Sequence, residues 1–145
     1  MQYLVVNDSD LEALIELRIR AMRPSLEAVG RFDPTRARER FANSFNPQNT
    51  RKIILDDKLV GFYVLIDRKT HLWLDHLYID PCYQGGGKGG VIIQHIQNLA
   101  TEQNLSLKLG ALIKSPANWF YLQQGFKHIE TQEWDNIYQW LPNAA

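Results

Sequence analysis

Three features of the sequence predict a mixed α/β or α+β fold with helices on both faces of a sheet. Strand and helix signals alternate along the chain, apolar residues recur at helical spacing, and a glycine-rich loop joins a strand to a helix. The 145 residues, of which 45% are apolar, are enough for one compact core. We find no repeat, low-complexity tract or linker, and therefore expect a single domain over residues 1–145.

The N-terminal segment predicts a strand followed by a helix. The strand covers residues 2–7. Ser9 and Glu12 have the spacing of a capping box, in which each side chain binds the backbone of the other residue. Apolar residues then follow at helical spacing, namely Leu11, Leu14, Ile15, Ile19 and Met22. This helix is predicted to end before Pro24, because the residue that precedes a proline disfavours the α conformation.

A second helix and three strands make up the middle of the chain. Asp33 and Pro34 are typical of an N-cap and a first helical position, and the helix they begin runs toward Phe45. The three strands, of which the first two form a predicted hairpin, cover residues 51–55, 59–66 and 71–79.

The C-terminal half predicts two more helices and three more strands. Apolar residues at helical spacing indicate a helix over residues 91–103. A short helix begins at Ser115 and Pro116 and ends at Gly125, since glycine is common just after a helix. The strands of this half are predicted over residues 105–113, 126–131 and 136–141. The resulting order is β-α-α-β-β-β-α-β-α-β-β.

The loop over residues 80–90 is the most informative segment of the sequence. Glycine occupies five of the six positions from Gly85 to Gly90. Because glycine has no Cβ and adopts positive φ readily, the backbone can curl around a ligand. The N–H groups then converge at the start of the following helix, whose dipole favours anions. The loop therefore predicts a nest that binds phosphate groups.

Other interpretations fit this loop less well. Gly85, Gly87 and Gly90 match the pattern of a dinucleotide-binding fold, but no acidic residue ends a strand about 20 positions later. An NTP-binding P-loop needs Ser or Thr after Gly87 and Lys88, where this chain has Gly89. A flexible turn without a ligand would place glycines at a helix start, each at a cost of about 1 kcal/mol in a helical position.

The loop and its flanks resemble the pyrophosphate-binding signature of the GNAT superfamily of acetyltransferases. That signature is Gln/Arg-x-x-Gly-x-Gly/Ala, and it follows a strand that ends in a bend. Gln84, Gly87 and Gly89 hold its fixed positions, after Leu-Tyr-Ile-Asp-Pro at residues 77–81. Lys88 stands where the family usually has an apolar residue. The predicted order of elements also matches the family, so the resemblance covers most of the chain.

A second match to the family lies near the C-terminus. The family pattern Asn-x-x-Ala-x-x-Phe-Tyr-x-x-x-Gly-Phe is met at Ala117, Phe120, Tyr121, Gly125 and Phe126. The asparagine of that pattern contacts the cofactor arm in the family. It aligns here with Lys114, and Asn118 lies four residues later. Either Lys114 or Asn118 could supply the contact.

The resemblance implies a fold, a cosubstrate and a set of binding residues. The implied GNAT fold is a mixed, mostly antiparallel sheet of about six to seven strands with helices on both faces. The implied cosubstrate is acetyl-coenzyme A, with no metal. Its diphosphate would bind the glycine loop, and its pantetheine arm would bind the end of the preceding strand. The residues implied in binding are Leu77, Tyr78, Ile79, Gln84, Gly85, Gly86, Gly87, Lys88, Gly89, Gly90, Asn118 and Tyr121.

The resemblance also implies direct transfer in a ternary complex, with coenzyme A leaving as a thiolate. Tyr121 matches the family's usual proton donor to that sulfur, because a phenol with a pKa of about 10 is protonated at neutral pH. The alternative for Tyr121 is a ring that packs into the core. For the base, which in related enzymes lies on the strand before the loop, Asp75 is the first candidate. His76 alternates onto the opposite face and is expected to be structural.

Asp75 also has a second interpretation. A carboxylate is a weak base unless burial raises its pKa, so Asp75 is equally suited to anchor the ammonium of an acceptor or to accept a hydrogen bond on the strand face. In the family the first two helices and their connection wall the acceptor site, and Trp73 and Trp119 could add aromatic walls. The polar and apolar residues of that helical segment are Arg18, Arg20, Met22, Arg23, Glu27, Arg31, Phe32 and Asp33. Their charges are mixed, and most are expected on a solvated face.

The function implied by the resemblance is acetylation of a primary amine on a small molecule. One alternative is acetylation of a protein N-terminus or lysine. Another is a non-catalytic module that senses acyl-coenzyme A, which would need the glycine loop but neither Tyr121 nor Asp75. The aromatic stretch at residues 134–140 is compatible with a homodimer interface.

Composition excludes several other classes of function. Lys plus Arg and Asp plus Glu both total 16, so the chain lacks the basic excess of a general nucleic-acid-binding protein. Cys82 is the only cysteine, which excludes an internal disulfide and a cysteine-rich metal site. The N-terminus lacks a signal-peptide pattern, and no apolar run reaches the roughly 20 residues of a membrane span. We therefore expect a cytoplasmic protein without nucleic-acid or membrane partners.

Overall fold

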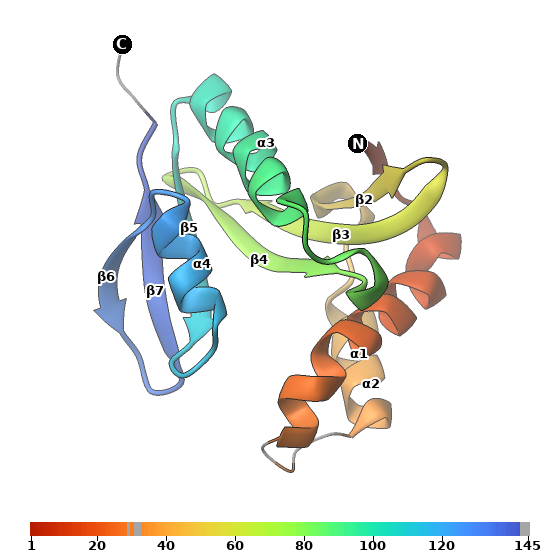
Figure 1. The fold of residues 1–145 in the computed structure, drawn as a ribbon. Coiled ribbons are helices and arrows are strands. Elements are labelled where there is room, and N and C mark those ends of the chain that lie inside the picture. The colour runs from red at the N-terminus through yellow and green to blue at the C-terminus, as the bar shows by residue number, and fades with distance from the viewer. Residues whose placement is uncertain (29, 31–32, 143–145) are drawn as a thin grey trace. The chain divides into compact units, whose positions relative to one another are not determined.

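The computed structural model describes residues 1–28, 30 and 33–142, which contain seven strands and four helices (Figure 1). Their order is the predicted one, with short 3-10 turns added between them. The elements are β1 (Gln2–Val5), α1 (Leu11–Ala28), α2 (Pro34–Ser44), β2 (Thr50–Leu55), β3 (Lys58–Asp67), β4 (His71–Ile79), α3 (Lys88–Gln103), β5 (Ser106–Leu112), α4 (Ala117–Gln123), β6 (Lys127–Thr131) and β7 (Asp135–Trp140).

The strands form a mixed sheet in the order β1-β2-β3-β4-β5-β7-β6. Strands β4 and β5 pair in parallel, whereas the pairs β1–β2, β2–β3, β5–β7 and β6–β7 are antiparallel. This confirms the predicted mixed, mostly antiparallel sheet. The chain divides into two compact units, Met1–Val64 with His76–Gln84, and Leu65–Asp75 with Gly85–Ala145. Strand β4 contributes to both units.

The first unit packs α1 and α2 side by side (Figure 1). Its core is apolar: Leu14 and Leu17 of α1 are 0% exposed, and so are Ile53 of β2 and Phe62 of β3. The ring of Phe41, in α2, lies edge-on to Phe62 with 5.4 Å between centroids. Burying each such side chain stabilises the unit by about 1.5–3 kcal/mol, which is why one apolar stripe per helix is enough to hold it in place.

Helix α1 differs from the prediction at both ends. Its N-terminal capping box is formed by Asn7 and Asp10 in a 3-10 turn, not by Ser9 and Glu12. At the other end α1 continues through Pro24 to Ala28. A proline inside a helix loses one hydrogen bond and costs about 3 kcal/mol in isolation. The helix nevertheless continues for one more turn, where Arg23 and Glu27, on either side of Pro24, form an i,i+4 ion pair.

Other boundaries in the first unit follow the sequence closely. Asp33 caps α2 by accepting a hydrogen bond from the backbone N–H of Arg36 at 3.1 Å, as its position before Pro34 predicts. Asp56 and Asp57 form the turn between β2 and β3, with φ of 51° and 62°. Two successive residues at positive φ are typical of the two-residue hairpin turn whose twist matches that of the strands.

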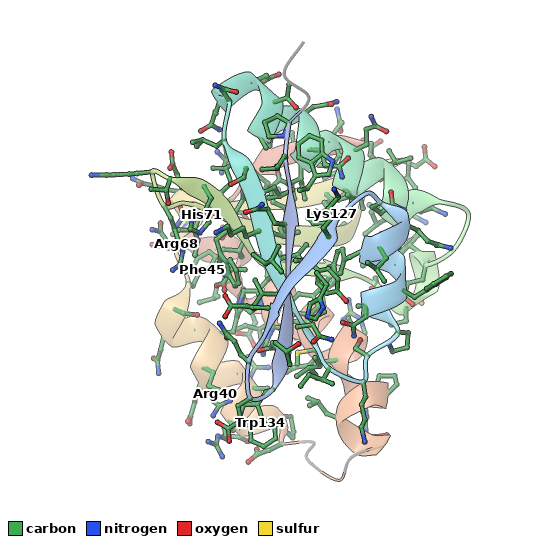
Figure 2. The ribbon with its side chains drawn as sticks, turned by 90° about the vertical axis from the view of Figure 1, so that its left-hand side faces the viewer. Arg40, Phe45, Arg68, His71, Lys127 and Trp134 are labelled. Atoms are coloured by element: carbon green, nitrogen blue, oxygen red, sulfur yellow. The ribbon has the colours of Figure 1, made fainter. Side chains whose placement is uncertain are left out.

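The second unit joins β4, β5, β7 and β6 with helices α3 and α4. Its core includes Ile92, Ile93 and Ile96 of α3, each 0% exposed, and Leu107 of β5, also 0% exposed. In Figure 2 the labelled Lys127 marks the start of β6, and the labelled Trp134 lies in the turn between β6 and β7.

Helix α3 begins at Lys88, three residues before the predicted start. Gly89 and Gly90 therefore lie in its first turn and not in the loop. A Cβ added to Gly90 would lie 3.4 Å from the side chain of Gln124, which is tighter than most such contacts. Close packing against the end of α4 thus favours glycine at this helical position despite its low helix propensity.

Candidate functional site

The glycine loop, by which we mean Gln84–Gly87 together with the first turn of α3 at Lys88–Gly90, reverses the chain between β4 and α3. Its central residues Gly85, Gly86 and Gly87 have φ of 94°, 66° and 79°. A side chain is strained at such angles, and three in succession require glycine. Gly87 is the N-cap of α3, which starts at Lys88 without a capping side chain. The backbone of the loop therefore lies at the N-terminus of α3, which is the positive end of the helix dipole.

The charges around the glycine loop favour an anion. Lys88 folds back so that its Nζ lies 3.4 Å from the carbonyl oxygen of Gly85. No acidic residue occurs between Pro81 and Gly90. A lysine beside a turn of positive-φ glycines at a helix N-terminus is suited to bind phosphate groups.

The start of the loop is tied to the end of β4 within the first unit. The Gln84 side chain donates a hydrogen bond to the carbonyl oxygen of Ile79 at 3.0 Å. Asp80, which is 7% exposed, accepts from the N–H of Cys82 at 3.1 Å and forms an ion pair with Arg20 at 2.8 Å. Burial by itself would raise the pKa of Asp80, but the Cys82 amide and the Arg20 guanidinium outweigh it and hold that pKa below its usual value.

The end of β4 directs alternate backbone groups to opposite edges. The N–H of Asp80 donates to the Val60 carbonyl at 2.8 Å, and a Cβ on Gly61 would lie only 2.5 Å from the Tyr78 carbonyl oxygen. Tyr78 and Asp80 therefore turn their backbone toward β3, and Leu77 and Ile79 turn theirs to the other edge. The parallel ladder of β4 with β5 ends at Leu74 and Leu109, so the backbone of Leu77 takes no part in it.

The side chains of Tyr78 and His76 belong to a cluster with α1 and α2. The hydroxyl of Tyr78 accepts from Arg18 Nε at 3.3 Å and lies 3.1 Å from His76 Nδ1. Arg18 also donates to the carbonyl of Ala37 at 3.2 Å, and Phe41 lies edge-on to the His76 ring at 5.6 Å. This packing agrees with the structural role expected for His76. The Tyr78 side chain is occupied by the cluster, so Tyr78 could contact a pantetheine arm only through its backbone.

Tyr121 lies in α4, where three aromatic rings surround it. Ring centroids of Phe120, Phe126 and Tyr138 lie 5.2, 5.6 and 6.4 Å from that of Tyr121. The Tyr121 carbonyl also accepts from the N–H of Phe126 at 3.2 Å, which closes the end of α4. The ring is half-buried, so its orientation is fixed, as a positioned proton donor requires. Core packing and proton donation both remain compatible with this arrangement.

Asp75 is exposed and lies on the same side of β4 as Trp73. The indole Nε1 of Trp73 donates a hydrogen bond to Asp75 Oδ1 at 3.1 Å. The contact agrees with the predicted strand alternation, which put these two residues on one face. A carboxylate in this setting can anchor an ammonium or accept its proton.

The side chain of Asn118 forms hydrogen bonds within the second unit. Its side-chain amide donates to the carbonyl oxygens of Leu112 at 2.7 Å and Ser115 at 2.8 Å, and its Oδ1 accepts from the Tyr138 hydroxyl at 2.8 Å and from Asn136 at 3.0 Å. These bonds join the β5–α4 connection to β7. Lys114 lies in that connection and is exposed.

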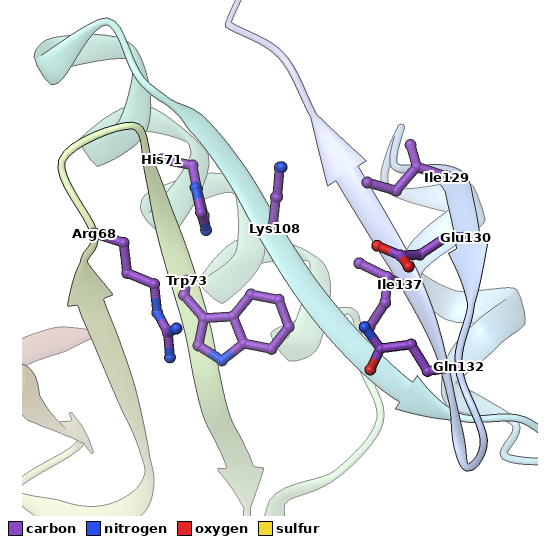
Figure 3. Close-up of a pocket in the computed structure, with 8 residues that line it drawn as sticks. All are labelled: Arg68, His71, Trp73, Lys108, Ile129, Glu130, Gln132 and Ile137. Carbon is purple, nitrogen blue, oxygen red and sulfur yellow. The ribbon is translucent and has the colours of Figure 1, made fainter.

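A pocket that the sequence did not indicate lies in the second unit (Figure 3). We call it the strand-face pocket, and its lining residues are Arg68, His71, Trp73, Lys108, Ile129, Glu130, Gln132 and Ile137. Figure 3 shows the Trp73 indole extending from β4 toward β5, with Arg68 beside it. From the sequence His71 carried no assigned role. The sequence did show that His71 and Trp73 share one face of their strand. It could not show which residues of β5, β6 and β7 lie beside them on that face.

Several of the residues expected to wall the acceptor site form hydrogen bonds or ion pairs within the first unit. Arg23 and Glu27 form an ion pair at 2.6 Å, and Asp33 caps α2. Arg31 and Phe32 lie outside the described residues. Within residues 1–28, 30 and 33–142, no group of three or more His, Cys, Asp or Glu side chains could hold a metal ion. No helix in this part of the chain is long and apolar enough to cross a membrane.

Residues 21–142 match the family described as the acetyltransferase (GNAT) domain. The match spans well over half of the chain, so the chain belongs to the GNAT acetyltransferase family. It is an acyltransferase of the N-acetyltransferase class, and acetyl-coenzyme A is its cosubstrate. No curated protein matches the chain.

Solved structures of three acetyltransferases share the fold at low sequence identity. PaiA N-acetyltransferase from Thermoplasma acidophilum, in complex with coenzyme A, is 16% identical with a TM-score of 0.80, covering 97% of this chain and 98% of its own. Ribosomal-protein-S18-alanine N-acetyltransferase from Escherichia coli is 16% identical with a TM-score of 0.75, covering 99% and 95%. A GNAT-family acetyltransferase from Staphylococcus aureus Mu50 is 19% identical with a TM-score of 0.74, covering 98% and 99%.

Proposed function

We propose that the protein transfers an acetyl group from acetyl-coenzyme A to a primary amine of a small molecule, by direct transfer in a ternary complex. The observation that supports this most is the glycine loop of a GNAT family member, in which three successive positive-φ glycines precede Lys88 and α3. The thioester supplies the acetyl group: the neutral amine attacks its carbonyl carbon, the C–S bond breaks, and the nitrogen loses a proton.

The residues of this chain have separate tasks in that reaction. Residues Gln84–Gly90 hold the diphosphate through backbone N–H groups and Lys88. The backbone of Leu77 and Ile79, at the edge of β4 that faces away from β3, binds the pantetheine arm; the Ile79 carbonyl also accepts from Gln84. Tyr121 donates a proton to the leaving sulfur, and Asp75 accepts the amine proton or holds the ammonium beforehand. Asn118 or Lys114 completes the contact with the arm.

Further parts of the proposal concern the setting of the enzyme. Residues 1–145 act as one domain, since the family match spans both compact units. A cytoplasmic location is supported by a single cysteine, which fits a reducing compartment. A homodimer is supported by Trp134 and Leu141, which are 59% and 62% exposed in the C-terminal strands and their flanks. One structural relative is named for a protein substrate, so the fold by itself does not select the acceptor.

Calorimetric titration with acetyl-coenzyme A, followed by free-thiol release against a panel of amines, tests the proposal. Binding with thiol release on one amine is the expected outcome. Binding without release on any small amine or peptide would favour a sensor of acyl-coenzyme A. Absence of binding would overturn the proposed role of the glycine loop.

A further inference from the structure

The strand-face pocket holds more positive than negative charge. Its volume is about 360 Å³, and all of its lining residues lie in the second unit. Arg68 and Lys108 contribute two cations, and Glu130 contributes one carboxylate. Among the described residues, none of these three side chains takes part in an ion pair. An acidic ligand would therefore find cations that are not already neutralised by the protein.

The surroundings of Lys108 and Arg68 favour binding of an anion. Lys108 is half-buried, with Trp73 opposite it in β4 and Gln139 opposite it in β7. The methylene stem of a half-buried lysine can pack against its neighbours while the ammonium stays accessible to an anionic ligand. The Arg68 guanidinium carbon lies 5.5 Å from the centre of the Trp73 ring. That contact limits the freedom of the guanidinium and leaves N–H groups for a carboxylate.

The imidazole of His71 lies close to the same two cations, Arg68 and Lys108. Its pKa is lowered from 6.5 by burial first, and then by the positive charges of Lys108 and Arg68. The imidazole is therefore neutral at pH 7. Two cations against the one carboxylate of Glu130 then leave a single net positive charge, which matches a monoanion such as a carboxylate better than a dianion.

The pocket is connected to the expected site of chemistry by Trp73, which forms a wall and hydrogen bonds to Asp75 at 3.1 Å. Along a strand, Trp73 and Asp75 are separated by about 7 Å, and His71 and Asp75 by about 13 Å. Ile137, 6% exposed, and Ile129 add apolar surface to the lining. An aliphatic chain that lies on this surface could link an acid in the pocket to an amine at Asp75.

We propose that the strand-face pocket binds a carboxylate of the acceptor, whose reacting amine reaches Asp75 at a distance of about 7–13 Å. This inference rests on the proposed function, because it assigns the acceptor of that reaction. It excludes acetylation of the α-amine of a free amino acid, where nitrogen and carboxylate share one carbon. It selects ω-amino carboxylic acids, the side-chain amine of lysine-like molecules and the N-terminus of short peptides.

Matched acceptors test the inference through free-thiol release with the full-length protein. ε-Aminocaproate and its neutral amide, ε-aminocaproamide, differ only in the charged group. We expect kcat/KM to be about tenfold or more higher for the acid, the scale of one charge-assisted contact. In Arg68→Gln and Lys108→Gln the ratio of acid to amide should fall toward one. The ratio is measured within each variant, so a change in the folded fraction cancels.

Lys127→Gln is the control variant, because Lys127 is an exposed cation of the same unit that does not line the pocket. It should keep the wild-type ratio. Equal kcat/KM for acid and amide in the wild type would overturn the inference, and so would an equal loss of preference in Lys127→Gln. Preference for aminoalkyl phosphates over ε-aminocaproate would also overturn it, because the pocket would then select a dianion.

Product binding separates a failed inference from a failed function. N-acetyl-ε-aminocaproate and its amide need no catalysis, and their binding can be measured by calorimetry beside that of acetyl-coenzyme A. Tighter binding of the acid, by about tenfold and lost in Arg68→Gln, supports the pocket even where no amine is turned over. Acetyl-coenzyme A binding without any preference for the acid overturns the pocket and leaves the acetyltransferase function standing.

Discussion

The glycine loop and the strand-face pocket present positive charge in two different ways. The loop uses backbone N–H groups, and its conformation depends on three glycines with φ between 66° and 94°. The pocket uses side chains, and their positions depend on packing, such as that of Arg68 against Trp73. Any Cβ disturbs the first kind of site, whereas the second tolerates a change of shape and responds to a change of charge. Substitutions at the two sites should therefore differ in how strongly they act.

The largest effect is expected from Gly87→Asp in the glycine loop. Aspartate tolerates φ of 79° about as well as asparagine does, but its carboxylate would repel the diphosphate. Affinity for acetyl-coenzyme A should fall about a hundredfold or more, as measured by calorimetry. Gly87→Asn is the matched control, because asparagine tolerates positive φ and carries no charge. It should lose much less affinity. Tight binding by the aspartate variant would mean that this loop does not hold the diphosphate.

Tyr121→Phe tests a side chain that packing holds in place. The three surrounding rings remain, so acetyl-coenzyme A should bind as in the wild type. Turnover should fall by about a hundredfold, the lower range for loss of a general acid. Single-turnover kinetics together with a binding titration measure both quantities. Unchanged turnover would show that the Tyr121 hydroxyl only packs.

Asn118→Ala distinguishes the two candidates for contact with the cofactor arm. Asn118 holds the β5–α4 connection to β7 through its whole amide, so its loss should lower the free energy of unfolding by about 1–3 kcal/mol in urea. Lys114→Ala, at an exposed position, should leave that free energy unchanged. A weaker affinity for acetyl-coenzyme A in only one of these variants identifies the residue that contacts the arm. If Asn118→Ala kept full stability, the hydrogen bonds of its amide would be dispensable.

The smallest effect concerns Asp80, which supports the start of the glycine loop. Its pKa is lowered in the folded protein, so its contribution to stability is present above the unfolded pKa of about 3.9 and is lost as pH falls through the lower folded value. Asp80→Asn should cost about 1 kcal/mol at pH 7, because the Arg20 side chain is 50% exposed and screened. In urea unfolding, the difference from wild type should shrink below about pH 4. A difference that is constant with pH would mean that charge is not involved.

The sequence was sufficient to predict an element of the fold where the pattern lies in neighbouring residues. The glycine run and the Asp33–Pro34 helix start each depend on local backbone preferences, and the structure confirms both elements. Residues at larger separation were harder to place. Pro24 was expected to end α1, because its local penalty is visible in the sequence, but the helix continues to Ala28 with an ion pair between Arg23 and Glu27.

The amino-acid sequence alone predicted the family, the cosubstrate and the glycine loop that we propose to bind its diphosphate, because these depend on a short contiguous pattern of glycines before a helix. Only the tertiary structure brought Arg68, Trp73, Lys108 and Glu130 to one face, since they come from four separate places along the chain. Strand pairing and register, which set Trp73 beside Lys108, are long-range choices made by the burial of a whole sheet face. The glycine loop thus consists of consecutive residues, whereas the residues of the strand-face pocket come together only when the chain folds.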